Sequence, residues 1–108
     1  MLESCDWLRG FEYHEQIGST QERARQLSAD RHQKLPALVL AARQTAGRGR
    51  GSHSWWSDAG ALTFSVVVDP VQLGLSFQPL SRLSLASSLA VCHVLSEHAP
   101  DRDCGIKW

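Results

Sequence analysis

The 108-residue sequence has few cysteines, no long apolar run and no net charge. Its three cysteines, Cys5, Cys92 and Cys104, are odd in number and widely spaced, which excludes a disulfide framework or zinc site and favours a reducing cytoplasm. The longest apolar run, residues 35–42, is far below the roughly 20 residues that span a bilayer. Eleven basic and eleven acidic residues argue against binding nucleic acid or membrane through overall charge.

Positive charge is nevertheless concentrated in one segment, because residues 31–57 contain five Lys or Arg and no Asp or Glu. Within it, Arg48 and Arg50 alternate with glycines, and two tryptophans follow. Glycine lets the backbone approach a ligand, and arginine offers a planar charged fork to carboxylate or phosphate. This pattern suits an anion-binding loop, but composition alone favours a plain surface turn with Trp55 and Trp56 as core anchors, because short Gly/Arg runs are common.

Apolar patterning predicts four strands. Residues 11–17 alternate between apolar and polar side chains, as in a half-buried strand. Residues 37–42 form a continuous apolar run, which is typical of a strand buried on both faces. Residues 62–68 predict a third strand that ends at Asp-Pro, and residues 104–108 predict the start of a fourth.

Two helices are predicted between these strands. Ser19 followed three residues later by Glu22 is a capping-box pattern, and helix formers continue through about Ala29. A longer helix is predicted from Gln78-Pro79, with apolar residues at helical spacing until Pro100. The alternating order favours an α/β or α+β class, with a mixed sheet flanked by helices.

Several short motifs occur in a characteristic order. They are Ser19-Thr-Gln21 after a strand, Gln44-Thr-Ala-Gly-Arg-Gly-Arg50, Trp55, Gly60-Ala-Leu-Thr-Phe-Ser65, and a terminal Ile106-Lys-Trp108. Together they resemble the catalytic domain of biotin–protein ligases from about residue 11 onward. The resemblance implies the biotin and lipoate ligase fold, which is related to class II aminoacyl-tRNA synthetases. We expect residues 1–108 to be the N-terminal part of that domain, without a DNA-binding domain and without the C-terminal part.

The resemblance implies an ATP-dependent ligase. Biotin would be activated as biotinyl-5'-adenylate with ATP and Mg²⁺, and then transferred to a lysine of a biotin carboxyl carrier domain. Two anions must be held together for the first step, so fixed positive charge is needed. The reactive intermediate must be shielded from water, which suits a glycine-rich loop that closes over it. Nucleic acid and membrane are not expected partners, and a homodimer is compatible with the resemblance.

Site residues carry over by their place in the motifs. Biotin would be bound by Ser19, Thr20, Gln21, Gln44, Arg48, Gly49 and Arg50. The adenylate loop would consist of Gly47, Arg48, Gly49, Arg50, Gly51 and Trp55. The residues implied in catalysis are Arg48, Arg50 and Lys107. No metal ligand is expected from the chain itself.

Two departures from the family pattern affect these expectations. Gln21 stands where asparagine is usual, and we expect its longer amide still to reach the ligand but to shift the floor of the pocket. Gly-Ser-His-Ser after Arg50 is less basic than in many relatives, so we expect the closed loop to retain the adenylate less tightly. An alternative is a catalytically incomplete fragment that only binds biotin or biotinyl-adenylate, and we expect residues 1–108 alone not to transfer biotin.

A nucleic-acid module using Arg-Gly repeats and stacking tryptophans is disfavoured by the neutral charge.

Overall fold

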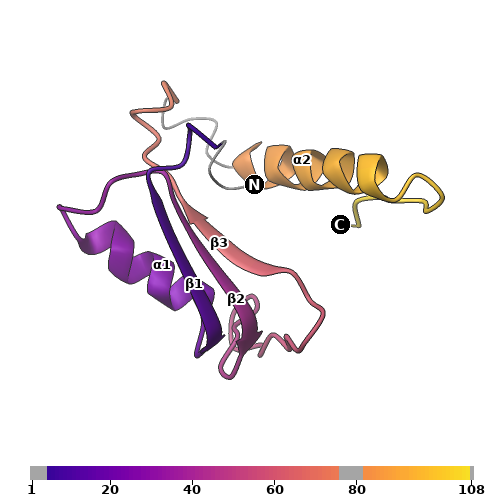
Figure 1. The fold of residues 1–108 in the computed structure, drawn as a ribbon, viewed down its shortest axis with the longest axis horizontal. Coiled ribbons are helices and arrows are strands. Elements are labelled where there is room, and N and C mark those ends of the chain that lie inside the picture. The colour runs from indigo at the N-terminus through magenta and orange to yellow at the C-terminus, as the bar shows by residue number, and fades with distance from the viewer. Residues whose placement is uncertain (1–4, 76–81, 108) are drawn as a thin grey trace. The chain divides into compact units, whose positions relative to one another are not determined.

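The computed structural model describes residues 5–75 and 82–107, which fall into two compact units, before and after the Asp69–Pro70 bond. The first unit contains one helix and three strands, and the second contains one helix (Figure 1). In chain order they are β1 (Gly10–Ile17), α1 (Thr20–Ala29), β2 (Ala37–Gln44), β3 (Thr63–Val67) and α2 (Leu83–His98). The strands predicted at residues 11–17, 37–42 and 62–68 are confirmed to within two residues at each end.

The three strands form one mixed sheet in the order β1-β2-β3. β1 and β2 run parallel, with Ile17 opposite Gln44, and β3 runs antiparallel to β2 (Figure 1). Parallel neighbours cannot be joined by a tight turn, so the chain crosses over between them through α1. The mixed sheet predicted from the sequence is confirmed.

Helix α1 begins where the sequence predicts. Ser19 has an extended backbone, and its hydroxyl oxygen accepts a hydrogen bond from the Glu22 N–H at 3.3 Å, so it is the N-cap. The helix then packs Ala24 and Leu27 onto the sheet, against Val39 and its neighbours. This small apolar cluster is the core of the first unit.

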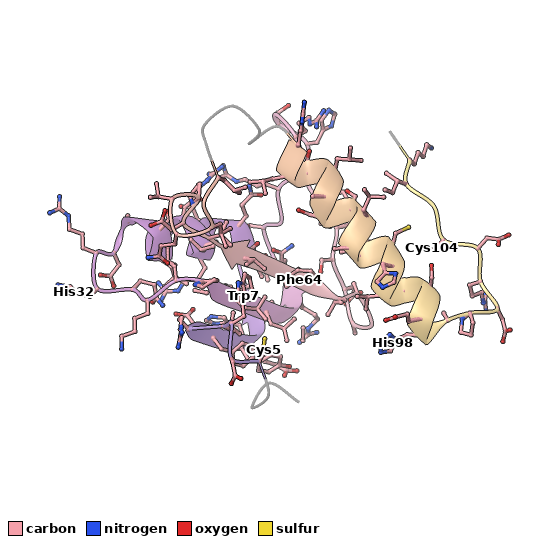
Figure 2. The ribbon with its side chains drawn as sticks, turned by 90° about the horizontal axis from the view of Figure 1, so that it is seen from above. Cys5, Trp7, His32, Phe64, His98 and Cys104 are labelled. Carbon is pink, nitrogen blue, oxygen red and sulfur yellow. The ribbon has the colours of Figure 1, made fainter. Side chains whose placement is uncertain are left out.

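The two faces of the sheet differ. Ala37, Val39 and Ala41 of β2 are buried on the face that α1 covers, whereas Leu38 and Leu40 on the other face are only partly buried. The prediction that β2 is buried on both faces is therefore wrong for the described unit, because α1 covers one face alone. On the uncovered face β1 and β3 add Phe11, Tyr13, Phe64 and Val66, each more than 40% exposed (Phe64 is labelled in Figure 2).

In the second unit, α2 ends at His98, just before Pro100, as predicted. The predicted start at Gln78-Pro79 lies outside the described residues. None of the sixteen residues of α2 is buried, so the apolar residues at helical spacing do not form a buried stripe. Within the described ranges, no helix is long and apolar enough to cross a bilayer.

The strand predicted over residues 104–108 is wrong as far as it is described, because residues 104–107 are irregular and Trp108 lies outside the described ranges. A strand persists only where its backbone groups pair with a neighbour, and the described residues of this unit contain no other strand. Cys104 instead approaches α2, with its Sγ 3.3 Å from the Sγ of Cys92 (Cys104 is labelled in Figure 2). That hydrogen bond raises the pKa of the Cys104 thiol.

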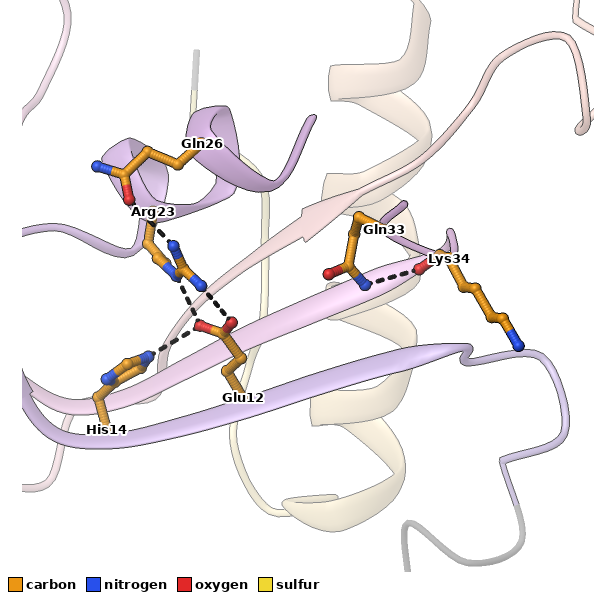
Figure 3. Close-up of polar contacts among 6 residues, drawn as sticks. All are labelled: Glu12, His14, Arg23, Gln26, Gln33 and Lys34. Carbon is orange, nitrogen blue, oxygen red and sulfur yellow. Dashed lines mark hydrogen bonds and ion pairs between the residues drawn. The ribbon is translucent and has the colours of Figure 1, made fainter. Parts of the chain in front are cut away.

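A carboxylate network joins β1 to α1 (Figure 3). Arg23 donates to both oxygens of Glu12, from Nε at 2.8 Å and from Nη2 at 2.7 Å, and the Nε2 of His14 lies 3.1 Å from the same carboxylate. The hydrogen bond from Arg23 is the main reason that the pKa of Glu12 falls from 4.5 to about 2. The network therefore stabilises the fold only while Glu12 is ionised.

We predict that this contribution disappears in acid. Because the pKa of Glu12 is lower in the folded state, its stabilisation is complete above about pH 4.5 and is lost as the pH falls towards 2. Replacing Glu12 with Gln should lower the melting temperature at pH 6 to 7, and the difference from the unaltered protein should shrink below pH 4. Glu15→Gln, on the same strand, is the control. A Glu12→Gln difference that stayed constant down to pH 2 would contradict the ionic role of the network.

Candidate active site

The candidate site lies where the carboxyl ends of β1 and β2 meet the N-terminus of α1. Strand pairing continues beyond the ends of both strands, because the Thr45 N–H donates to the Ile17 carbonyl at 2.9 Å and the Ala46 N–H donates to the Gly18 carbonyl at 2.8 Å. This extension brings the end of β2 beside the first turn of α1. Ser19 and Thr20 are nearly buried there, with 7% and 3% of their surface exposed.

Three polar side chains from three elements form a connected network in this place. The backbone N–H of Thr20 donates to Gln44 Oε1 at 2.8 Å, and the Thr20 hydroxyl donates to the same oxygen at 3.1 Å. The Thr20 Oγ1 also lies 2.9 Å from the Oγ of Ser65 on β3. Two donors on one amide oxygen fix which way the Gln44 amide faces, and its NH₂ group remains for a ligand.

These side chains line a cavity of about 280 Å³. Six of the residues that line it were predicted from the sequence to bind biotin or to belong to the adenylate loop, namely Ser19, Thr20, Gln21, Gln44, Arg48 and Trp55. Leu62 and the first residues of β3, including Ser65, line the cavity as well and were not assigned. Ser65 could have been found, since it is a polar residue in a strand whose neighbours Phe64 and Val66 are apolar.

A second cavity of about 160 Å³ adjoins the first and shares Ser19, Gln21 and Arg48 with it. Gly49 and Gly51 of the loop line this cavity. Glu22 and Arg25 of α1 also line it, and the two form an ion pair at 3.4 Å. Arg48 thus supplies positive charge to both cavities, close to the amino end of a helix, where anions are favoured.

The glycine-arginine loop folds back on itself as a narrow ribbon. The Gly49 N–H donates to the His53 carbonyl at 2.8 Å, and the Trp55 N–H donates to the Gly47 carbonyl at 2.7 Å. Gly51 turns the ribbon with a positive φ of 66°, which glycine adopts without strain. The ribbon therefore presents its arginines from an ordered backbone, whereas closure over a ligand stays a prediction.

Gly47 has a specific steric role in this ribbon. It is buried, and a Cβ at this position would overlap the Trp55 carbonyl oxygen and lie 2.8 Å from Gln44 Nε2. A Cβ at Gly49 would instead meet the His53 Cβ at 3.4 Å, an ordinary contact. The backbone at Gly47 is therefore packed against both the returning strand of the ribbon and the amide of Gln44, and a larger residue would fit only if these neighbours shifted.

The remaining assigned residues are more exposed. The surface of Trp55 is 63% exposed and that of Trp56 is 86% exposed, so neither is a core anchor. The side chain of Arg50 is exposed near the tip of the ribbon. Lys107 is exposed too, and it belongs to the unit that follows Asp69, not to the unit that contains the cavity.

Metal binding by the chain itself finds no support in residues 5–75 and 82–107, where no three His, Cys, Asp or Glu side chains are grouped closely enough to hold an ion. Glu22 is the carboxylate that lines the second cavity, and it is paired with Arg25. Mg²⁺ is typically held by one or two carboxylates together with substrate phosphates. A single carboxylate that is already paired with an arginine is too small a ligand set to hold Mg²⁺ without further ligands.

The sheet, the polar cavity and the adjoining arginine ribbon together form a site in which hydrogen-bonding side chains lie next to positive charge. A family model described as the biotin/lipoate A/B protein ligase family matches residues 13–108. The chain belongs to this family. The fold class and the relationship to biotin–protein ligases expected from the sequence are confirmed.

Individual relatives agree with this assignment. The chain is 37% identical to a biotin–protein ligase of Schizosaccharomyces pombe over 73 residues, which cover 65% of this chain and 12% of that protein. It is 35% identical to the bifunctional ligase/repressor BirA of Bacillus subtilis over 97 residues, which cover 89% of this chain and 28% of that protein. It thus spans less than a third of the length of either relative.

Solved structures of a Leishmania major biotin protein ligase share the fold. The complex of that ligase with biotinyl-5-AMP superposes with a TM-score of 0.69 at 35% identity, covering 82% of this chain and 34% of that one. The complex with biotin gives a TM-score of 0.67 at 34% identity, covering 85% of this chain and 34% of that one.

We predict that Gly47→Ala disrupts the ribbon. The new methyl group must displace the Trp55 carbonyl, and overpacking of this kind costs about 1–3 kcal/mol of folding free energy. Hydrogen exchange at the Trp55 amide, which donates to Gly47, should accelerate. Gly18→Ala is the control, because a Cβ there meets nothing within 4 Å and its φ is not positive. Unchanged exchange at Trp55 in Gly47→Ala would mean that the close packing is not maintained in solution.

Proposed function

We propose that this chain forms the biotin-activating site of a biotin–protein ligase, which makes biotinyl-5'-adenylate from biotin and ATP and transfers the biotinyl group to a lysine of a carrier domain. The observation that carries the proposal is the cavity in which Ser19, Thr20 and Gln44 meet Arg48 of the ribbon. A cyclic urea has both donors and acceptors, and the cavity offers both to it. The ligase complexes that share this fold support the choice of ligand.

In the first step, a carboxylate oxygen of biotin attacks the α-phosphorus of ATP, and pyrophosphate leaves. Both reactants are anions, so their approach requires fixed positive charge beside the reacting atoms. We assign this role to Arg48 and Arg50 of the ribbon. Gly47 and Gly49 allow the backbone to come near the ligand, and Trp55 offers a flat apolar surface that can cover it.

In the second step, the neutral amine of the carrier lysine attacks the carbonyl carbon of the adenylate, the amide forms, and AMP leaves with the bonding electron pair. The amine loses a proton in the process. We assign Lys107, from the motif that resembles the strand end of the family, to interactions with the charged groups of this reaction. The acceptor proposed here is a biotin carboxyl carrier domain.

ATP would enter as its Mg²⁺ complex, in which the ion neutralises phosphate charge, and the side chains named above would position that complex. Three cysteines with free thiols among the described residues support a reducing, cytoplasmic location. The balanced charge of the sequence, eleven basic and eleven acidic residues, supports a protein substrate rather than nucleic acid.

The first test is biotin-dependent exchange of pyrophosphate into ATP by the full-length gene product. We expect exchange with biotin and none with lipoate or without an acid. Transfer to an acceptor carrier domain is measured in parallel. Exchange that ignored biotin would refute the proposal, and biotin binding without exchange or transfer would support the alternative of a binding protein that lacks catalysis.

The second test concerns Arg50. Its proposed contact is to phosphate charge on the adenylate, and a charge-assisted hydrogen bond contributes about 1.5–3 kcal/mol. Arg50→Gly should therefore release biotinyl-adenylate about tenfold to a hundredfold faster, while calorimetry shows little change in biotin affinity. Released adenylate should acylate lysines of an added bystander protein. Arg31→Gly removes an exposed cation outside the ribbon and should have neither effect. A loss of biotin affinity without adenylate release would overturn the assignment.

A further inference from the structure

Ser65 on β3 is the member of the polar network that none of the sequence motifs assigned a role. Its hydroxyl oxygen lies 2.9 Å from the Thr20 Oγ1, and its side chain lines the 280 Å³ cavity. It stands on the face of the sheet that α1 covers, opposite Val39, between two apolar residues of the strand. A hydroxyl at such a position is stabilised only if its hydrogen-bonding capacity is used.

The direction of each hydrogen bond in the network can be deduced from one fixed donor. A backbone N–H can only donate, so the atom of Gln44 that lies 2.8 Å from the Thr20 nitrogen must be the amide oxygen. The Thr20 hydroxyl lies 3.1 Å from that same oxygen and must donate to it as well. Its single hydrogen is then committed, so the contact with Ser65 requires Ser65 to be the donor.

This order leaves complementary groups for a ligand. Ser65 has given its hydrogen to Thr20, and its oxygen can therefore only accept a hydrogen bond from the cavity. Gln44 has its oxygen occupied by two donors, and it can offer only the hydrogens of Nε2. The network thus has a fixed polarity, with one acceptor on β3 and one donor at the end of β2.

We propose that Ser65 is a specificity-determining residue that accepts an N–H of the cyclic urea of biotin, an inference that rests on the proposed function. The urea has two N–H donors and one carbonyl acceptor, which match the acceptor at Ser65 and the donor at Gln44. The dithiolane ring of lipoate has no N–H and would leave Ser65 unpaired. Sites that hydrogen-bond a substrate group discriminate strongly against analogues that lack it.

The test compares Ser65 variants of the full-length gene product by calorimetry with biotin. Ser65→Ala should weaken biotin binding about fivefold to tenfold, as expected for one neutral hydrogen bond. Ser65→Thr keeps a hydroxyl and suits a strand, so it should retain most of the affinity. Ser28→Ala removes a hydroxyl from α1 outside the cavity and is the control for general effects. If Ser65→Ala proves unstable in thermal melts, Ser65→Cys replaces it.

Two biotin analogues, each methylated on one urea nitrogen, separate ligand contact from structural support. The analogue that lacks the N–H accepted by Ser65 should bind equally to the unaltered protein and to Ser65→Ala. An equal loss for biotin and both analogues would mean that Ser65 only supports Thr20, and would overturn the inference. Unchanged biotin affinity in Ser65→Ala would overturn the inference about Ser65 and leave the proposed function intact. Failure of the unaltered protein to bind biotin would refute the proposed function, and the inference with it.

Discussion

Parallel pairing of β1 with β2 is the constraint on which the first unit depends. Because the strands run in the same direction, their carboxyl ends meet at one edge of the sheet, and the helix that joins them begins at that edge. The register that places Ile17 opposite Gln44 brings the amide of Gln44 within 2.8 Å of the Thr20 nitrogen. A shift of one residue would turn Gln44 to the other face of the sheet and remove the polar wall of the cavity.

Local signals made much of this fold predictable. Alternation, continuous apolar runs and the Ser19 cap are properties of neighbouring residues, and the three strands and α1 appear where these signals predict them. Most of the assigned cavity residues could be named because they belong to short contiguous motifs. Lys107 remains an assignment by resemblance, since it belongs to the other unit.

Features that depend on contacts between distant segments could not be read from the sequence. Ser65 joins the network only because β3 pairs with β2 and faces α1, 45 residues from Thr20 in the sequence. The sequence places Gly47 in the adenylate loop, but it does not show that a side chain there would meet the carbonyl of Trp55. The expected strand over residues 104–108 failed for the same reason, since strand formation needs a partner that no local pattern supplies.

The carboxylate network on β1 also bears on self-association. β1 lies at an edge of the described sheet, and an unpaired edge can recruit a strand from another molecule. The ion pair between Glu12 and Arg23 lies on this edge strand, and its charged groups are costly to remove from water even when they are paired. Charge on an edge strand is one of the features that disfavour pairing with a strand of another molecule, so the ion pair that joins β1 to α1 also gives this edge a feature of that kind.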